Sequence, residues 1–190
     1  MNDAPNRSGP GGRDGAVDPV PAGGLGWLSP RQRDGGIDRV PLPAATPGEL
    51  WLCGKHAIAP LAATPDAIGW TTVVCLVERH ELTPRYPHYV AWLDAGGDRV
   101  LWWPIPDLHA PALPAMAAFV EDLVGRLRAG ASLLVHCGAG IGRAGTTAVC
   151  VLVRLGLGLA DAEHTVGAAR PMAGPEVGAQ RELCRAFASR

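Results

Sequence analysis

Short apolar runs alternate along this chain with longer stretches in which apolar residues recur every three to four positions. The apolar and β-branched runs predict strands at residues 49–53, 71–77, 99–103 and 131–136. The run at 71–77 is almost entirely apolar, which is typical of a strand covered on both faces. Each run is bounded by glycine, proline or polar residues, so the strands are expected to be short and separate.

Helical periodicity fills most of the segments between and after these strands. We expect helices at residues 61–68, 86–95, 114–129, 143–155, 161–170 and 176–189. The apolar residues of 114–129 fall on one face, Pro114 suits a first turn, and Gly130 follows the end. The segment 143–155 is apolar on nearly every side, so that helix should be buried in the middle of the protein.

Alternating strands and helices predict an α/β fold, with a central, largely parallel sheet of four to five strands flanked by helices in a three-layer sandwich. Residues 1–35 are rich in glycine and proline and contain few large apolar groups, which predicts a disordered tail. A docking tail is the alternative. Trp27 and Leu28 are the first residues expected to anchor the chain on the domain. Residues 36–190 are expected to form one domain.

Composition excludes several classes of protein. The 190 residues carry a formal net charge of −1, which implies no general affinity for nucleic acid or for a membrane surface. No apolar run is long enough to span a bilayer, and the N-terminus lacks the pattern of a secretory signal. The five cysteines show neither a disulfide framework nor zinc-site spacing, so we expect a cytoplasmic protein without a metal or other cofactor.

The strand expected at 131–136 leads into a loop with the chemistry of an anion site. The loop reads His136-Cys137-Gly138-Ala139-Gly140-Ile141-Gly142-Arg143, and its small residues let successive backbone N–H groups point into one concavity. The following helix turns its positive end toward the same point, and Arg143 can bind two phosphate oxygens at once. This positive field should lower the pKa of Cys137 below that of a free thiol, which predicts a thiolate nucleophile.

A thiolate that attacks a phosphate ester needs an acid to protonate the departing oxygen. Asp107 ends the segment Pro104-Ile105-Pro106-Asp107, directly after a predicted parallel strand. It should therefore lie at the same edge of the sheet as the Cys137 loop, and the two prolines should stiffen its own loop. We expect Asp107 to be the acid, with His109 on the same loop as the second candidate.

These segments resemble the cysteine-dependent protein tyrosine and dual-specificity phosphatases, in particular the compact branch that includes the kinase-associated phosphatase. The resemblance covers about residues 48–188. It is carried by the segments His136 to Arg143, Pro104 to Asp107, Val74 to Leu82 and Ala169-Arg170-Pro171, and by Gln180. It supports the α/β sandwich expected from the pattern of strands and helices.

The resemblance also implies a role for each matching residue. Cys137 is the nucleophile, Arg143 clamps the phosphate, and Asp107 is the acid. The backbone amides of Gly138, Ala139, Gly140, Ile141, Gly142 and Arg143 hold the phosphate, and Gln180 helps to place the hydrolytic water. The implied reaction forms a cysteinyl-phosphate and then hydrolyses it, with no metal.

One position departs from the family pattern. The residue after the arginine is usually serine or threonine, whose hydroxyl stabilises the thiolate, whereas this chain has Ala144. Loss of one charge-assisted hydrogen bond costs about 1.5–3 kcal/mol, which corresponds to about a ten- to hundredfold loss of rate. Thr146 and Thr147 are near in sequence but lie elsewhere on the helix. We therefore expect a slower enzyme.

The expected substrate is a phosphorylated protein or peptide. No segment matches one that would build a deep aryl pocket, so a shallow site should accept phosphotyrosine and also phosphoserine or phosphothreonine. Between Cys137 and Arg143 the loop has no lysine or second arginine, which argues against a polyanionic inositol lipid.

Other readings of the same residues stay open at this point. Ala144 favours a pseudo-phosphatase or a phosphopeptide-binding module, although mere binding would not require Asp107. A rhodanese-like sulfurtransferase also uses a cysteine in a strand-to-helix loop, and arsenate reduction would need further redox cysteines. Cys75 could form a disulfide with Cys137 under oxidation, with a buried core cysteine as the alternative.

Overall fold

The computed structural model describes residues 36–59 and 70–190. The predicted tail at 1–35, its anchor at Trp27 and the helix expected at 61–68 lie outside the described residues. The division of the chain into a tail and one domain therefore stays a prediction.

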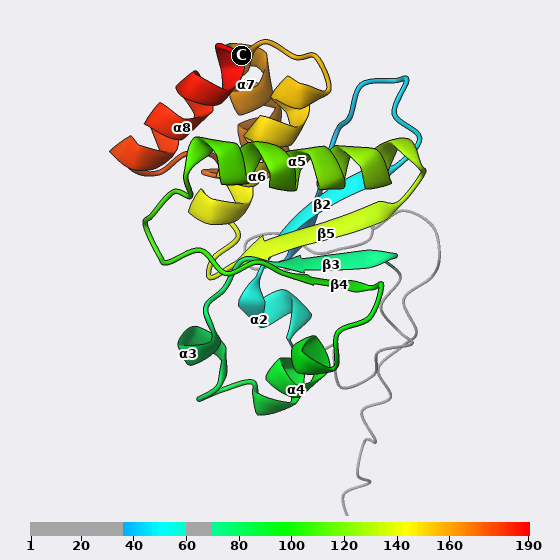
Figure 1. Ribbon diagram of the computed structural model, residues 1–190, viewed down its shortest axis with the longest axis vertical. Coiled ribbons are helices and arrows are strands. Elements are labelled where there is room, and N and C mark those ends of the chain that lie inside the picture. Colours follow the sequence, from blue (N-terminus) through cyan, green and yellow to red (C-terminus); the bar gives the residue numbers. More distant parts are fainter. Residues whose placement is uncertain (1–35, 60–69) are drawn as a thin grey trace, which may run out of the picture.

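The strands form one five-stranded sheet with the order β1-β2-β5-β3-β4 (Figure 1). Its strands are β1 (Ile37–Val40), β2 (Glu49–Gly54), β3 (Thr72–Cys75), β4 (Val100–Trp102) and β5 (Ser132–Cys137). β1 is antiparallel to β2, and every other pair is parallel. The predicted α/β fold with a largely parallel sheet is confirmed.

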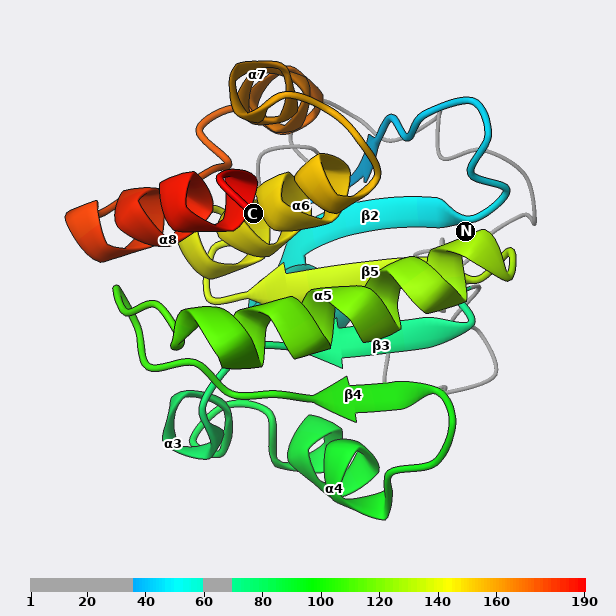
Figure 2. The same ribbon diagram turned by 45° about the horizontal axis from the view of Figure 1, so that its top comes forward.

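Helices cover both faces of this sheet. They are α2 (Lys55–Ile58), α3 (Arg79–Leu82), α4 (Pro87–Ala95), α5 (Leu113–Arg128), α6 (Gly142–Arg154), α7 (Leu159–Ala169) and α8 (Gly178–Ala188). The first three lie on one face and the last four on the other, so the protein has three layers (Figures 1 and 2). No helix within the described ranges is both long and apolar enough to cross a bilayer.

Sequence periodicity missed β1, α2 and α3. Each of them has four residues, which is about one turn of helix or a minimal strand. Two or three of the four residues in each are charged or histidine, so no apolar run marks these segments, and their formation depends on what they pack against.

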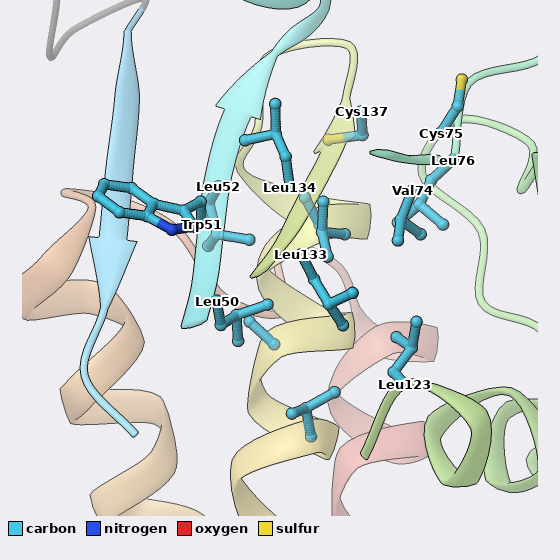
Figure 3. Packing of buried hydrophobic residues seen from close by; sticks show 14 of the residues in the cluster. Leu50, Trp51, Leu52, Val74, Cys75, Leu76, Leu123, Leu133, Leu134 and Cys137 are labelled. Carbon is cyan, nitrogen blue, oxygen red and sulfur yellow. The ribbon is translucent and has the colours of Figure 1, made fainter. Parts of the chain in front are cut away.

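Most of the core lies between the sheet and the layer of α5 to α8. Residues 142–152 of α6 are all buried, as expected for a helix that is apolar on nearly every side. The inner face of α5 buries Leu123 and its apolar neighbours against the sheet, where Leu133 of β5 also points (Figure 3). Because α6 contacts β5, α5, α7 and α8, its first turn is held rigidly from several sides.

The parallel strands bring the functional segments together. β2, β3, β4 and β5 run in the same direction, so their carboxyl ends lie at one edge of the sheet. The chain leaves this edge into α2, into α3, into the loop that holds Asp107 and into the Cys137 loop. Segments more than 80 residues apart in sequence, such as those that contain Gly54 and Cys137, are thus neighbours in space.

The close approach of α6 to the loop after α7 predicts an asymmetry between two helical glycines. A Cβ atom at Gly145 would lie 2.1 Å from the backbone nitrogen of Gly174, whereas one at Gly125 on α5 would meet nothing within 4 Å. We expect Gly145→Ala to lower the free energy of unfolding by about 1–3 kcal/mol through overpacking. Gly125→Ala should leave it unchanged or raise it by up to about 1 kcal/mol, because alanine is the better helix former. Urea unfolding of both variants measures the difference, and equal effects would contradict this packing.

Candidate active site

The Cys137 loop is shaped by hydrogen bonds to its carbonyl groups. Arg170 donates from Nη2 to the Ala139 oxygen at 2.8 Å and from Nε to the Gly140 oxygen at 2.9 Å. The Lys55 amide donates to the Gly138 oxygen at 3.0 Å. Gly140 has φ of 77°, and a Cβ atom there would lie 2.4 Å from the Cys53 carbonyl. Only glycine fits this position without strain.

Arg170 is itself buried and paired. Its Nη1 donates to Asp38 Oδ2 at 2.5 Å and to the Gly36 oxygen at 3.1 Å. Only 3% of Arg170 and 7% of Asp38 is exposed, so this ion pair lies inside the protein. Asp38 sits on β1, the strand that the sequence pattern did not predict. β1 therefore supports the loop from behind, through Arg170.

The inner side of the loop presents hydrogen-bond donors without acceptors. Among the described residues, no acceptor is bound by any backbone N–H from Gly138 to Arg143. Arg143 is 3% exposed, and its buried Nε likewise has no partner among them. These donors surround the start of α6, where the helix dipole adds positive potential. An anion with several oxygens, such as phosphate, would satisfy them together.

Glu81 fixes the other edge of the Arg143 guanidinium. Nη1 and Nη2 of Arg143 donate to the two carboxylate oxygens of Glu81 at 2.7 and 3.1 Å, and Nη1 also donates to the Ile105 oxygen at 2.8 Å. Burial opposes ionisation of Glu81, but hydrogen bonds and the charge of Arg143 outweigh it and lower the pKa of this carboxyl. The bidentate pair engages Nη1 and Nη2 and leaves Nε without a partner among the described residues.

A capping box could have indicated Glu81 from the sequence. Glu78 is the N-cap of α3, and its backbone N–H donates to Glu81 Oε1 at 3.2 Å. The pattern Glu-x-x-Glu directly after a buried strand is consistent with such a cap. What it does not indicate is the partner, because Arg143 is 62 residues away in the chain.

Asp107 contacts the same guanidinium. Its Oδ1 lies 3.0 Å from Arg143 Nη2, while 66% of its side chain is exposed. The predicted acid and the predicted phosphate clamp are thus brought together, and Cys137, which is 3% exposed, lines the same hollow as they do.

A hollow of about 360 Å³ joins these residues. Its walls are formed by Lys55, His56, Glu81, Asp107, Leu108, Cys137, Gly138, Ala139, Gly142, Arg143 and Glu176. Of these, no role in the site was assigned from the sequence to Lys55, His56, Glu81, Leu108 or Glu176. The part of the chain that the structure describes contains no cluster of three His, Cys, Asp or Glu side chains that could hold a metal ion.

Comparison with protein families identifies this arrangement. The family model described as "Swiss Army Knife protein, DSP-PTPase phosphatase domain" matches residues 55–186, which include all the residues around the hollow. The chain belongs to the DSP-PTPase phosphatase family. The family resemblance seen in the sequence is therefore confirmed.

Solved phosphatase structures share the fold. Tk-PTP in its active form is 29% identical, with a TM-score of 0.58 over 75% of this chain and 91% of that one. The kinase-associated phosphatase, with serine in place of its catalytic-site cysteine, is 20% identical, with a TM-score of 0.69 over 80% of this chain and 93% of that one. Human DUSP28 is 24% identical, with a TM-score of 0.58 over 80% and 93%. The last two, below 25% identity, show the fold alone. Among curated proteins, no match to the chain is found.

The family's glutamine element lies beside the hollow and does not line it. Gln180 is in the first turn of α8 and is 1% exposed. Its Oε1 accepts a hydrogen bond from the Glu176 amide at 2.9 Å, and its Nε2 donates to the His109 oxygen at 3.2 Å. His109, the second candidate for the acid, is exposed. Its Nδ1 forms a hydrogen bond of 2.6 Å with the backbone oxygen of Asp107, not with the carboxyl group.

Cys75 has the properties of a core cysteine. Burial raises its pKa to about 12, so the thiol stays protonated at neutral pH and is a poor attacking group. In Figure 3 the Cys137 sulfur points toward β2, and the Cys137 and Cys75 sulfurs do not point toward each other. A disulfide between them remains a prediction for an oxidised form that would require both side chains to turn.

The phosphatase family's loop histidine is buried next to the nucleophile. His136 is fully buried, and its Nε2 shares a hydrogen bond of 2.6 Å with the Tyr89 hydroxyl. Burial, assisted by the charges of Arg143 and Lys55, lowers the pKa of His136 to about 3. The imidazole is therefore neutral in the folded protein at neutral pH.

This burial predicts a pH dependence of stability. The pKa of His136 is about 3 when folded and about 6.5 when unfolded, so its stabilising contribution is complete above pH 6.5 and is lost as the pH falls toward 3. Over pH 6 to 4.5 we expect the free energy of unfolding to fall more steeply in the wild type than in His136→Asn, by about 1.4 kcal/mol per pH unit. Urea unfolding over this range checks the prediction. Parallel slopes would mean that His136 is not held neutral.

Proposed function

We propose that this protein hydrolyses phosphotyrosine in proteins or peptides, and also phosphoserine and phosphothreonine, through a cysteinyl-phosphate intermediate. One observation carries the proposal. Cys137 lies at the base of a hollow whose unpaired amides and Arg143 Nε suit a phosphate, and Asp107 lies 3.0 Å from the same guanidinium.

In the first step, the Cys137 thiolate attacks phosphorus from below. The S–P bond forms and the P–O bond to the leaving group breaks, while the carboxyl of Asp107 passes its proton to the departing oxygen. The loop amides and Arg143 stabilise the charge on the equatorial oxygens. Because Glu81 already orients the guanidinium, little reorganisation is needed.

In the second step, water replaces the leaving group. Asp107, now a carboxylate, accepts a proton from that water as its oxygen attacks phosphorus. The S–P bond breaks, the electrons return to the Cys137 sulfur, and phosphate departs. Because the side chain of Asp107 is exposed, it can reach both the leaving group and the water, which occupy the same side of the phosphorus in turn.

The charges around the hollow favour a monoester on a protein side chain. The argument against a polyanionic lipid considered the loop alone, and the fold adds Lys55 to the site. However, Lys55 Nζ donates a hydrogen bond to the backbone oxygen of Glu81 at 3.0 Å and lies 3.9 Å from the carboxylate oxygen Oε2 of Glu81. Asp107 and Glu176 add negative charge at the mouth. A substrate with several phosphates would meet more repulsion than attraction there.

A phosphopeptide-binding module is the second candidate, and Ala144 supports it. Ala144 is fully buried at the start of α6 and offers no hydroxyl to the Cys137 sulfur. Against it stands the Asp107–Arg143 contact, since binding alone has no use for an acid at this place. A sulfurtransferase likewise has no need of Asp107. For either function we propose a cytoplasmic location, because the five cysteines carry no disulfide framework.

Replacement of the two reacting side chains tests the enzyme reading. Under reducing conditions without added metal, we expect wild-type protein to turn over p-nitrophenyl phosphate and Cys137→Ser to show no turnover. Asp107→Asn should lower kcat by about 10²- to 10⁴-fold, the usual contribution of a positioned acid. A folded wild type that binds vanadate but does not turn over would establish the binding module instead. Turnover of thiosulfate and cyanide would establish a sulfurtransferase.

Restoring the missing hydroxyl tests the role of Ala144. We expect Ala144→Ser to raise kcat by about ten- to a hundredfold, because one charge-assisted hydrogen bond to the leaving thiolate returns. Ala148→Ser is the matched control, since Ala148 is equally buried one turn further along α6. If both serine variants behave alike, the hydroxyl acts on folding and not on the thiolate.

A further inference from the structure

Gln180 joins the two loops that flank the mouth of the site. Its side-chain amide has an acceptor at one end and a donor at the other, and both are used. The partners fix its orientation, since the Glu176 N–H can only meet Oε1 and the His109 carbonyl can only meet Nε2. A buried amide is costly unless bonded in this way, so the 1% exposed Gln180 acts as a tie between loops.

The turn that holds Asp107 needs such a tie. Pro106 to His109 form a turn closed by the His109 amide, which donates to the Pro106 oxygen at 3.1 Å. Leu108 inside it has φ of 58°, a left-handed conformation that is unfavourable for leucine, and is 54% exposed. A strained and exposed turn has little stability of its own.

The two ends of the turn are fastened differently. Before Asp107, the Ile105 amide donates to the Leu76 oxygen at 3.1 Å and the Ile105 oxygen accepts from Arg143. After Asp107, within the part of the chain that is described, the Gln180 bond is the one hydrogen bond that reaches residues 108–111 from another element. The next such bond is at Ala112, whose oxygen accepts from the Met116 amide of α5 at 3.0 Å. Without Gln180, residues 108–111 would be held by packing alone.

The same amide rests on the phosphate loop. Gln180 Oε1 lies 3.2 Å from where a Cβ atom of Gly142 would be, and the Glu176 carboxylate lies closer still, at 2.1 Å. Gly142 is the first residue of α6. Gln180 therefore links the Asp107 turn to the first turn of α6, the element proposed to bind phosphate.

Building on the proposed function, we propose that Gln180 is a positioning residue that fastens the Asp107 turn for the first chemical step. In that step the Asp107 proton goes to the leaving oxygen as the S–P bond forms. This role differs from the one that the family resemblance implies, which is to place the hydrolytic water of the second step. The two roles affect different steps and can be separated.

The test uses Gln180→Met, which keeps the length of the side chain and removes both hydrogen bonds. Gln180→Glu is the second variant, since its carboxylate can accept from Glu176 but cannot donate to His109 when ionised. Arg181→Met, at the exposed next position, is the control. We expect kcat/KM for phenyl phosphate to fall about 10- to 100-fold more than kcat/KM for p-nitrophenyl phosphate in both Gln180 variants. The poorer leaving group depends more on the acid, and Arg181→Met should show no such difference.

Placement of water would give the opposite result. The first step would be intact, so kcat/KM would be unchanged for both esters, and phosphocysteine would accumulate after a burst of phenol. That outcome overturns the proposal. If Gln180→Met fails to fold, Gln180→Glu gives the same comparison.

Hydrogen exchange keeps this inference separate from the proposed function. We expect the His109 amide to exchange faster in both Gln180 variants than in wild type and in Arg181→Met, whether or not the protein turns over aryl phosphates. A wild type without turnover would refute the proposed function alone. An unchanged exchange rate at His109 in folded Gln180 variants would refute the tie.

Discussion

The buried guanidinium of Arg143 is the constraint on which the site depends. A cation with 3% exposure is stable only if nearby groups replace the water that it has lost. Glu81 supplies both carboxylate oxygens, Ile105 supplies a backbone oxygen, and Asp107 approaches from the mouth. Glu81 follows β3, and Ile105 and Asp107 both follow β4, so the charge of Arg143, which itself follows β5, holds the ends of three parallel strands in a fixed relation. The Nε that remains unpaired points to an anion as its natural partner.

A second buried cation, Arg170, supports the loop from the other side. Arg143 belongs to the inner surface of the site, whereas Arg170 binds the outward carbonyl groups of Ala139 and Gly140. Holding the carbonyls outward leaves the amides to face inward, and this is how a short glycine-rich loop becomes an anion site. Asp38 on the antiparallel edge strand neutralises Arg170, which gives a four-residue strand a role in the chemistry.

The site combines a rigid part, the Cys137 loop with the start of α6, and a more exposed part, the Asp107 turn. The loop and the start of α6 are buried and tied on several sides, as electrostatic stabilisation of a transition state requires. The Asp107 turn is exposed and strained, and it gains its position from bonds to Arg143 and, through His109, to Gln180. In the proposed reaction the Asp107 carboxyl group reaches a leaving group in one step and a water in the next, and an exposed turn on a fixed base suits both.

The sequence by itself determined the local chemistry and the order of elements. The apolar runs predicted the four parallel strands and the buried helix α6, because burial leaves a pattern over five to thirteen residues that can be read without the fold. The loop from His136 to Arg143 could be interpreted because its glycines, cysteine and arginine act within one segment.

Tertiary structure alone decided which distant side chains complete the site. No local pattern assigns Glu81, Lys55, Glu176 or Asp38 to the site, because the residues that they meet there lie tens of residues away in the chain. The family resemblance pointed to Gln180, but its contacts with His109 and Glu176 became evident only from the fold. The physical reason is that a pair of charges or an amide tie is specified by proximity in space. Only the parallel sheet, which gathers the ends of its strands at one edge, creates that proximity.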